Sequence, residues 1–214
     1  PQNNSATIPH GLTQKPDFWI VKSTTRTADW IAYTQKVDGS LDFGHINNTE
    51  YFSASSATVP TATTFGVYGD DINYAGATQI AYLWHDVPGL QKFGQYKGNQ
   101  STDGPFVELG FRPALLIIKS SSASSTNWRI IDDTRRPYNW GANDSTSEGG
   151  PWLKVNSNAV EVDERPVDLL SNGFKIQGAW GGDLNYDSGT PTYIYAAWAH
   201  QPYHNLYGGQ SNAR

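Results

Sequence analysis

The 214-residue sequence contains no cysteine and no methionine, and charged residues make up only 16% of it. Without cysteine the chain has no disulfide framework, no thiolate metal site and no thiol nucleophile. No apolar run approaches the ~18 residues that a membrane-spanning helix needs, and the first residues lack the pattern of a secretory signal peptide. We therefore expect no membrane partner.

Grouped positive charge is also missing from the sequence. The 15 lysine and arginine residues are scattered, and the net charge is −5 at pH 7. A nucleic-acid-binding surface needs clustered basic side chains that neutralise phosphates. We therefore expect no nucleic-acid partner.

What the sequence does contain is typical of β-sheet proteins. Aromatic residues reach 13%, and 21 glycines and 12 prolines separate short apolar runs. Aromatic and β-branched residues favour strands, whereas Gly and Pro mark the turns between them. We predict an all-β fold of sandwich-like units, without a helical bundle.

A repeated pattern divides the chain into two related units of about 105 residues each. Each unit has an apolar run that ends in Lys, then a Trp after a polar loop, and a closing strand that ends in Trp. The matched residues are Lys22 and Lys119, Trp30 and Trp128, and Trp84 and Trp198, at offsets of 97, 98 and 114 residues. We predict two tandem, internally duplicated β-sandwich repeats, 1–91 and 92–214, that pack rigidly against each other.

The matched segments also predict individual strands. The runs at 18–22 and 115–119 are continuously apolar, as expected of a central strand that is covered on both faces. Segments 92–96 and 105–108 look like leading strands of the second unit, and only the latter has a counterpart in the first unit, at 3–10. Because the other counterpart is missing and the chain has no methionine, we expect further chain upstream.

The same residues carry a resemblance to a known family. The Gly, Pro, apolar run and Lys, followed by Trp, Gly-Phe and the closing Tyr-Ile-Tyr-Ala-Ala-Trp at 193–198, resemble a tandemly repeated domain of uncharacterised function. That domain occurs in tail-fibre and other structural proteins of tailed phages, notably marine and cyanobacterial ones. Segments 92–99, 102–107 and 211–214 are similar to its connecting and terminal segments. The resemblance implies a location on the virion surface, and it supplies no catalytic residues and no cofactor.

Phage appendages of this kind are commonly symmetric. The resemblance therefore implies a homo-oligomer, with a trimer favoured, that contacts other virion proteins. The long aromatic loop of the second unit, 138–152, departs from the repeated pattern. Any role implied by the family is least secure in this loop.

The repeat separates two kinds of tryptophan. Residues present in both units are most simply core, which predicts burial of the shared set and of Trp19, whose counterpart is apolar. Trp140, Trp152 and Trp180 have no counterpart. They lie in loops with polar and aromatic residues that include Tyr138, Asp144 and Tyr186.

These unmatched residues form the candidate ligand site. An exposed aromatic ring can stack on the apolar C–H patches of a sugar, while neighbouring amides and carboxylates fix its hydroxyls, so a glycan site is one interpretation. The alternatives are that the rings pack the long loop onto its own sandwich or lie in a subunit contact, where Trp and Tyr are also enriched. A host surface polysaccharide is the partner that the first interpretation implies.

No catalytic or metal motif emerges from the sequence. The adjacent carboxylates Asp70-Asp71, Asp132-Asp133 and Asp163-Glu164 would point to opposite faces of a strand, so they do not form a glycosidase pair by themselves. Asp70 and Asp71 with Asn73 could hold Ca²⁺ through oxygen ligands, but the spacing of a calcium loop is absent. His200 and His204 are four residues apart, which would place both on one face of a helix as in a zinc site. Pro202 lies between them and would interrupt such a helix. We expect no enzyme and no metal centre.

The absence of catalytic motifs predicts a non-enzymatic module, and the resemblance implies that it is a structural or adhesion module of a phage tail fibre or similar appendage. Two alternatives stay open. One is a capsid-decorating or fibre-forming subunit without a ligand, in which the unmatched tryptophans would be buried between subunits. The other is a polysaccharide-degrading domain, which would require carboxylates that converge in a groove.

Overall fold

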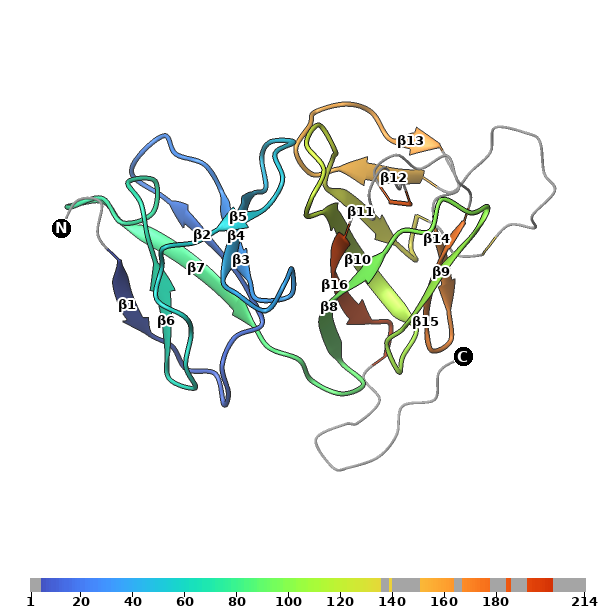
Figure 1. The fold of residues 1–214 in the computed structure, drawn as a ribbon, viewed down its shortest axis with the longest axis horizontal. Helices are drawn as coiled ribbons and strands as arrows, with labels where there is room; N and C mark the ends of the chain where they lie inside the picture. The colour runs from blue at the N-terminus through green and yellow to red at the C-terminus, as the bar shows by residue number, and fades with distance from the viewer. Residues whose placement is uncertain are drawn as a thin grey trace.

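The computed structural model describes residues 5–135, 139, 151–163, 167–177, 184–185 and 192–201. Every regular element in these ranges is a β-strand, which confirms the all-β prediction. Within the described ranges there is no helix long and apolar enough to cross a membrane. The strands form two units that lie side by side along the chain, the first to the left and the second to the right in Figure 1.

The first unit contains two sheets. Its strands are β1 (Ala6–Pro9), β2 (Phe18–Ser23), β3 (Ile31–Thr34), β4 (Asp42–His45), β5 (Ser53–Ala54), β6 (Thr64–Val67) and β7 (Gln79–Trp84). Five of them form a sheet in the order β5-β4-β3-β2-β7, and β1 pairs with β6 in a two-stranded sheet. All pairings in the unit are antiparallel.

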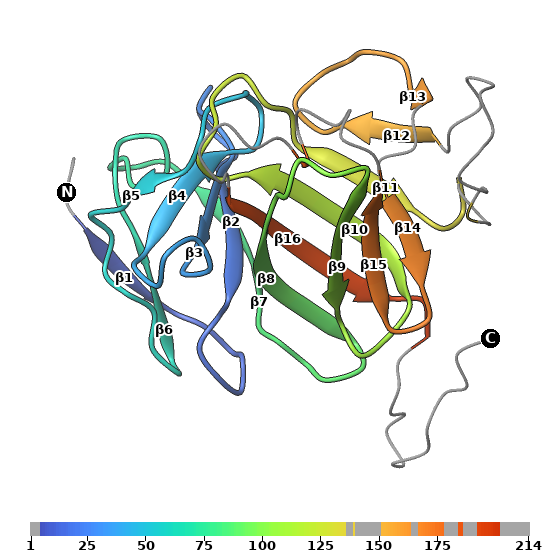
Figure 2. The ribbon, with the colours of Figure 1, turned by 45° about the vertical axis from the view of Figure 1, so that its right-hand side comes forward.

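The second unit repeats this arrangement with two additions. Its strands are β8 (Gln91–Lys97), β9 (Asp103–Glu108), β10 (Pro113–Ser120), β11 (Arg129–Asp132), β12 (Pro151–Lys154), β13 (Val162–Asp163), β14 (Val167–Leu170), β15 (Gly173–Gln177) and β16 (Thr192–Ala199). The larger sheet has the order β13-β12-β11-β10-β16-β8, and the smaller has the order β14-β15-β9. Strands β8 and β14 are the two additions: each adds one edge strand to a sheet of the second unit and has no equivalent in the described sheets of the first (Figure 2).

The strand registers of the two units correspond residue by residue. The matching pairs are Phe18 with Trp84 and Lys22 with Ile80 in the first unit, and Leu115 with Trp198 and Lys119 with Ile194 in the second. The same holds in the smaller sheets, where the pair Ile8 with Phe65 corresponds to Val107 with Phe174. The offsets that the sequence predicted thus lead to equivalent places in the strand registers of the two units.

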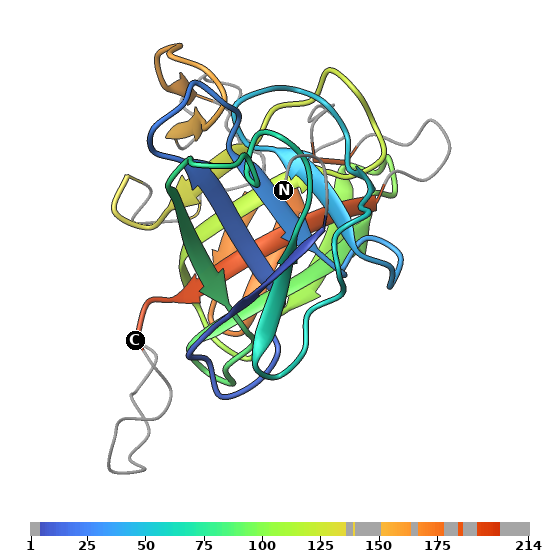
Figure 3. The same ribbon diagram turned by 90° about the vertical axis from the view of Figure 1, so that its left-hand side faces the viewer.

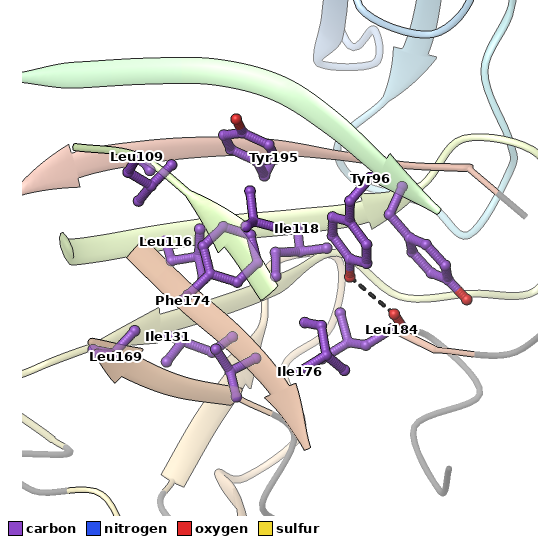
Figure 4. Close-up of a cluster of buried hydrophobic side chains, with 14 of the residues drawn as sticks. Tyr96, Leu109, Leu116, Ile118, Ile131, Leu169, Phe174, Ile176, Leu184 and Tyr195 are labelled. Carbon is purple, nitrogen blue, oxygen red and sulfur yellow. Dashed lines mark hydrogen bonds between the residues drawn. The ribbon is translucent and has the colours of Figure 1, made fainter. Parts of the chain in front are cut away.

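Each unit has its own core between its two sheets. In the first, Trp19 and Tyr33 stack with ring centroids 5.3 Å apart, and Phe65 of the opposite sheet packs against Trp19. In the second, Leu116 and Ile118 of β10 face Phe174 and Ile176 of the smaller sheet (Figure 4). The predicted burial of Trp19 is confirmed, because none of its surface is exposed.

A third apolar cluster lies between the units. It joins the outer faces of the two larger sheets, and its buried members are Phe18, Ala32, Phe52, Phe93, Trp128, Ile194 and Ala196. The central strands are thus covered on both faces, as their continuous apolar pattern predicted. The same double coverage explains why polar and apolar residues do not alternate along the closing strand β16. Its residues face either the second core or the third cluster, and both are apolar.

The shared tryptophans do not all lie in a core, and here the prediction was wrong in part. Trp128 is buried in the third cluster, with 2% of its surface exposed, whereas its counterpart Trp30 is 39% exposed. Trp84 and Trp198 are partly buried and touch each other edge to face, with centroids 5.9 Å apart. The physical reason is that these residues sit on the outer faces, which are buried only where the units meet.

Candidate functional site

In the first unit an asparagine in the loop after β4 holds that loop against the residues that precede β3. The backbone N–H of Trp30 donates to Asn47 Oδ1 at 3.0 Å, and Asn47 Nδ2 donates to Asp29 Oδ1 at 2.7 Å. These bonds hold Asp29 two residues before the start of β3, and its Oδ2 faces His45 at the end of β4. The local sequence therefore presents a carboxylate at one end of the larger sheet.

The second unit has the same hydrogen bonds with a different side chain. The backbone N–H of Trp128 donates to Asn156 Oδ1 at 2.9 Å, and Asn156 Nδ2 donates to Asn127 Oδ1 at 3.1 Å. Asn127 thus stands where Asp29 stands in the first unit. Because an amide makes the same bond, the charge of Asp29 is not needed for the scaffold.

Around Asp29 the first unit gathers a cluster of ionisable side chains, the His45 cluster, consisting of Asp29, His45, Glu50 and Asp71. His45 ends β4, and its Nδ1 lies 3.0 Å from Glu50 Oε2 while its Nε2 lies 3.8 Å from Asp29 Oδ2. One ligand atom from each of Asp29, His45 and Asp71 lies within 4.8 Å of the others. Three carboxylates thus surround one imidazole.

The second unit does not reproduce this cluster in its described residues. His45 pairs with Ile31 across the sheet, and the corresponding pair is Lys154 with Arg129. A lysine therefore replaces the histidine, and Asn127 replaces the aspartate. What the units share is scaffold, so the acidic cluster with its histidine is the feature of the first unit that packing does not require.

The arrangement has two chemical capabilities. Carboxylate oxygens and an imidazole nitrogen are ligands for divalent cations, so Asp29, His45 and Asp71 could hold one. Carboxylates beside exposed aromatic rings could also accept hydrogen bonds from hydroxyl groups. Trp30 directly follows Asp29, and Tyr51, which is 51% exposed, directly follows Glu50.

The sequence did not predict the His45 cluster. Asp70, Asp71 and Asn73 were the residues that could have held Ca²⁺, but the fold instead brings Asp71 to Asp29 and His45. Only the pairing of β3 with β4 and the return of the loop after β6 make these residues neighbours. The substitution of Asp for Asn between the repeats was the one signal in the sequence that could have indicated them.

The predicted glycan platform finds no support where it can be compared with the structure. Trp152 is only 2% exposed and lies in the second core, where the Arg129 guanidinium covers its ring at 3.9 Å. A buried ring is not available for stacking on a sugar, so the prediction for Trp152 was wrong. The other five residues of that prediction lie outside the described residues: Trp140, Trp180, Tyr138, Asp144 and Tyr186.

A second pair of carboxylates lies at the turn between β3 and β4. Burial and the neighbouring Asp38 carboxylate raise the pKa of Asp42 to about 6. Hydrogen bonds from Ser40 lower the pKa of Asp38, whose Oδ1 accepts from the backbone N–H of Ser40 at 2.8 Å. Each of the two carboxyl groups shifts the pKa of the other, so they are close neighbours at this turn.

These features define a class of protein: an all-β protein of two similarly arranged sandwich-like units, with an apolar cluster between their larger sheets. The chain belongs to the family described as domain of unknown function DUF7483, whose model matches residues 2–202. The match spans both units and the link between them. A search of curated proteins and a search of solved structures each found no match.

Proposed function

We propose that this chain is a structural module of a tailed-phage virion appendage, a tail fibre or a similar projection. The proposal rests on the resemblance of the repeat to tail-fibre modules and on the contact between the two units. A projecting fibre must resist bending, and tandem domains move relative to one another unless their interface is extensive and apolar. The contact between the units is the observation that carries the proposal.

That contact is apolar at its centre and tied by hydrogen bonds. Phe18 of β2 stacks on Phe93 of β8 with centroids 5.8 Å apart. The ring N–H of Trp128 donates to the backbone oxygen of His45 at 2.8 Å. Hinge motion between the units would expose these rings and break this bond, so the pair of units behaves as one stiff element.

A backbone bond and a buried lysine add to the same contact. The N–H of Phe52 donates to the backbone oxygen of Ser121 at 3.0 Å. Lys119, which has no exposed surface, donates to the backbone oxygen of Thr49 at 3.3 Å. Polar groups from both units are therefore satisfied across the contact, which specifies a single relative orientation.

Location on the particle tests this proposal directly. Antibodies raised against the chain should decorate the tail appendage in immunogold micrographs of intact phage that carry it. Labelling of the capsid instead would favour the alternative of a capsid-decorating subunit. Absence of the chain from purified particles would overturn the proposal.

An adhesive role is the second candidate, and the exposure of Trp30 favours it. The same tryptophan is buried in the second unit but presents its ring to solvent in the first, next in sequence to the carboxylate of the His45 cluster. We propose that this end of the first sheet contacts host surface polysaccharide, with Trp30 or Tyr51 as the stacking ring.

A glycan array should detect binding by the whole chain, and Trp30→Ala should weaken it at least tenfold. Val160→Ala is the matched control, because Val160 is also exposed but belongs to the second unit. Equal binding by Trp30→Ala and Val160→Ala would exclude Trp30 as the stacking ring, and equal binding by Tyr51→Ala as well would exclude this end of the sheet. Release of oligosaccharide from a bound polysaccharide would instead support the polysaccharide-degrading alternative.

A further inference from the structure

Strand β7 lies at the edge of the larger sheet of the first unit, at the position where the sheet of the second unit continues with a further strand. In the second unit the equivalent strand β16 is covered by β8, with seven residue pairs from Thr192–Lys97 to Trp198–Gln91. In the described part of the first unit, β7 is the last strand of its sheet and pairs only with β2. Figure 3 shows β7 at the rim of the sheet.

The backbone groups that face outward from this edge can be identified. The backbone oxygens of Trp84 and Thr78 accept hydrogen bonds from the N–H groups of Asp17 and Thr24. The backbone groups of the even-numbered residues of β7 therefore point toward β2. Successive residues of an antiparallel strand face alternate sides. The N–H and C=O groups of the odd-numbered residues 79, 81 and 83 therefore point away from β2, into the position that β8 occupies in the second unit.

The outer face of this strand is also less covered than that of its counterpart. Ile80 and Tyr82 are 39% and 43% exposed, whereas Ile194 and Ala196, which belong to the third cluster between the units, are each 3% exposed. Phe93 of β8 is a member of that cluster, so the strand that pairs with β16 also helps to cover its outer face. The amide of Gln79 is buried and has no hydrogen-bond partner among the described residues.

The edge also lacks the features that normally prevent strand addition. Natural edge strands are protected by charged residues, proline, bulges or short length. Strand β7 has the sequence Gln-Ile-Ala-Tyr-Leu-Trp, which contains neither charge nor proline, and it pairs with β2 over six consecutive residues without a bulge. Such an edge can bind an extended segment through main-chain hydrogen bonds.

We propose that β7 is a strand-acceptor site, and that its occupant is a linking strand of the β8 type from a further unit of the same fold. The occupant runs antiparallel to β7 in the register of β8 on β16. An aromatic residue equivalent to Phe93 lies opposite Tyr82, and one equivalent to Tyr96 lies opposite Gln79. The incoming strand completes the first sheet, so units join in series through their sheet edges.

This inference does not depend on the proposed location in a virion. It follows from the comparison of the two sheets, and it would hold for any tandem array of the family. Failure of the immunogold experiment would leave it intact, and failure of the experiment below would leave the proposed function intact.

The test uses a synthetic peptide with the sequence of residues 89–99, labelled with a fluorophore and added to the whole chain. Fluorescence anisotropy should report saturable binding, and a scrambled peptide should not bind. Ala81→Pro removes an outward N–H of β7 at a position where an edge strand tolerates proline. It should weaken binding at least tenfold.

A matched control exists at the opposite edge of the same sheet. Ala54 is an exposed alanine of β5, and the N–H of Ser55 faces β4, so the N–H of Ala54 points outward. Ala54→Pro should leave peptide binding unchanged. If Ala81→Pro fails to fold by circular dichroism, Tyr82→Lys replaces it, with Tyr68→Lys as its control, because Tyr68 is a similarly exposed tyrosine outside β7.

Three results would overturn the proposal. The peptide does not bind the wild-type chain, or Ala81→Pro and Ala54→Pro bind it equally well. Alternatively, light scattering shows a dimer that Ala81→Pro dissociates while the peptide does not compete. That last result would mean that β7 pairs with β7 of a second copy and not with a linking strand.

Discussion

The two units place equivalent residues in opposite environments, and the outer face of the larger sheet shows this most clearly. Lys22 and Lys119 occupy the same position in the register, yet Lys119 is fully buried between the units and Lys22 is only partly buried. Trp30 and Trp128 differ in the same way. The fold of a unit therefore does not determine which of its outer residues are core, because the neighbouring unit does.

The largest effect expected from this difference concerns the two tryptophans. Trp128→Ala removes a buried ring and its 2.8 Å bond to the His45 backbone oxygen, and should lower the free energy of unfolding by about 4 kcal/mol. Trp30→Ala should lower it by less than about 1 kcal/mol, because the ring is exposed. Urea denaturation followed by far-ultraviolet circular dichroism measures both. Similar losses would contradict the assignment of Trp128 to the contact between units.

The two lysines give the next largest contrast. Lys119 Nζ donates to the backbone oxygen of Thr126 at 2.8 Å, to its hydroxyl at 2.7 Å and to the backbone oxygen of Thr49 at 3.3 Å. Lys119→Met leaves these acceptors unpaired and should cost about 2 to 3 kcal/mol. Lys22→Met removes one bond to the Ser23 backbone oxygen and should change stability by less than about 1 kcal/mol.

A double-mutant cycle sharpens this second comparison. Lys119→Met combined with Phe52→Ala should be less destabilising than the sum of the two single changes, because both residues bind across the same contact. Strict additivity would mean that Lys119 stabilises only its own unit through Thr126.

The sequence predicts features that depend on residues close in the chain, and it does not predict features that depend on how distant segments and the two units pack. The strands and their registers were predictable because the repeat supplies each assignment twice: Lys22 and Lys119 fall at equivalent places. The exposure of Trp30 was not, because it depends on where the second unit packs. The His45 cluster was not either, because its members come from three separate segments that only the folded sheet brings together.

A smaller effect on stability is expected at the turn between β3 and β4 of the first unit, where the free energy of unfolding should depend on pH. The pKa of Asp42 is raised to about 6 in the folded chain, so folding favours the protonated form. Its contribution to stability is fully present below about pH 4 and is lost as the pH rises through about 6. Asp42→Asn should remove this loss, with a gain of about 1 kcal/mol at pH 8 after allowance for solvent screening. Equal pH profiles of the variant and the wild type by thermal melting would contradict the shift.

The smallest effect is expected where the units differ in charge but share their hydrogen bonds. Asp29→Asn gives the first unit the side chain that Asn127 provides in the second, and the amide oxygen can still accept from Asn47 Nδ2. The free energy of unfolding should therefore change by less than about 0.5 kcal/mol. Asn47→Ala, which removes the shared scaffold, should cost about 1 to 2 kcal/mol. A loss at Asp29 as large as that at Asn47 would mean that the carboxylate belongs to the scaffold. A neutral result would mean that the fold does not need the negative charge of Asp29. Its role would then lie in the His45 cluster, where the carboxylate is available to a ligand.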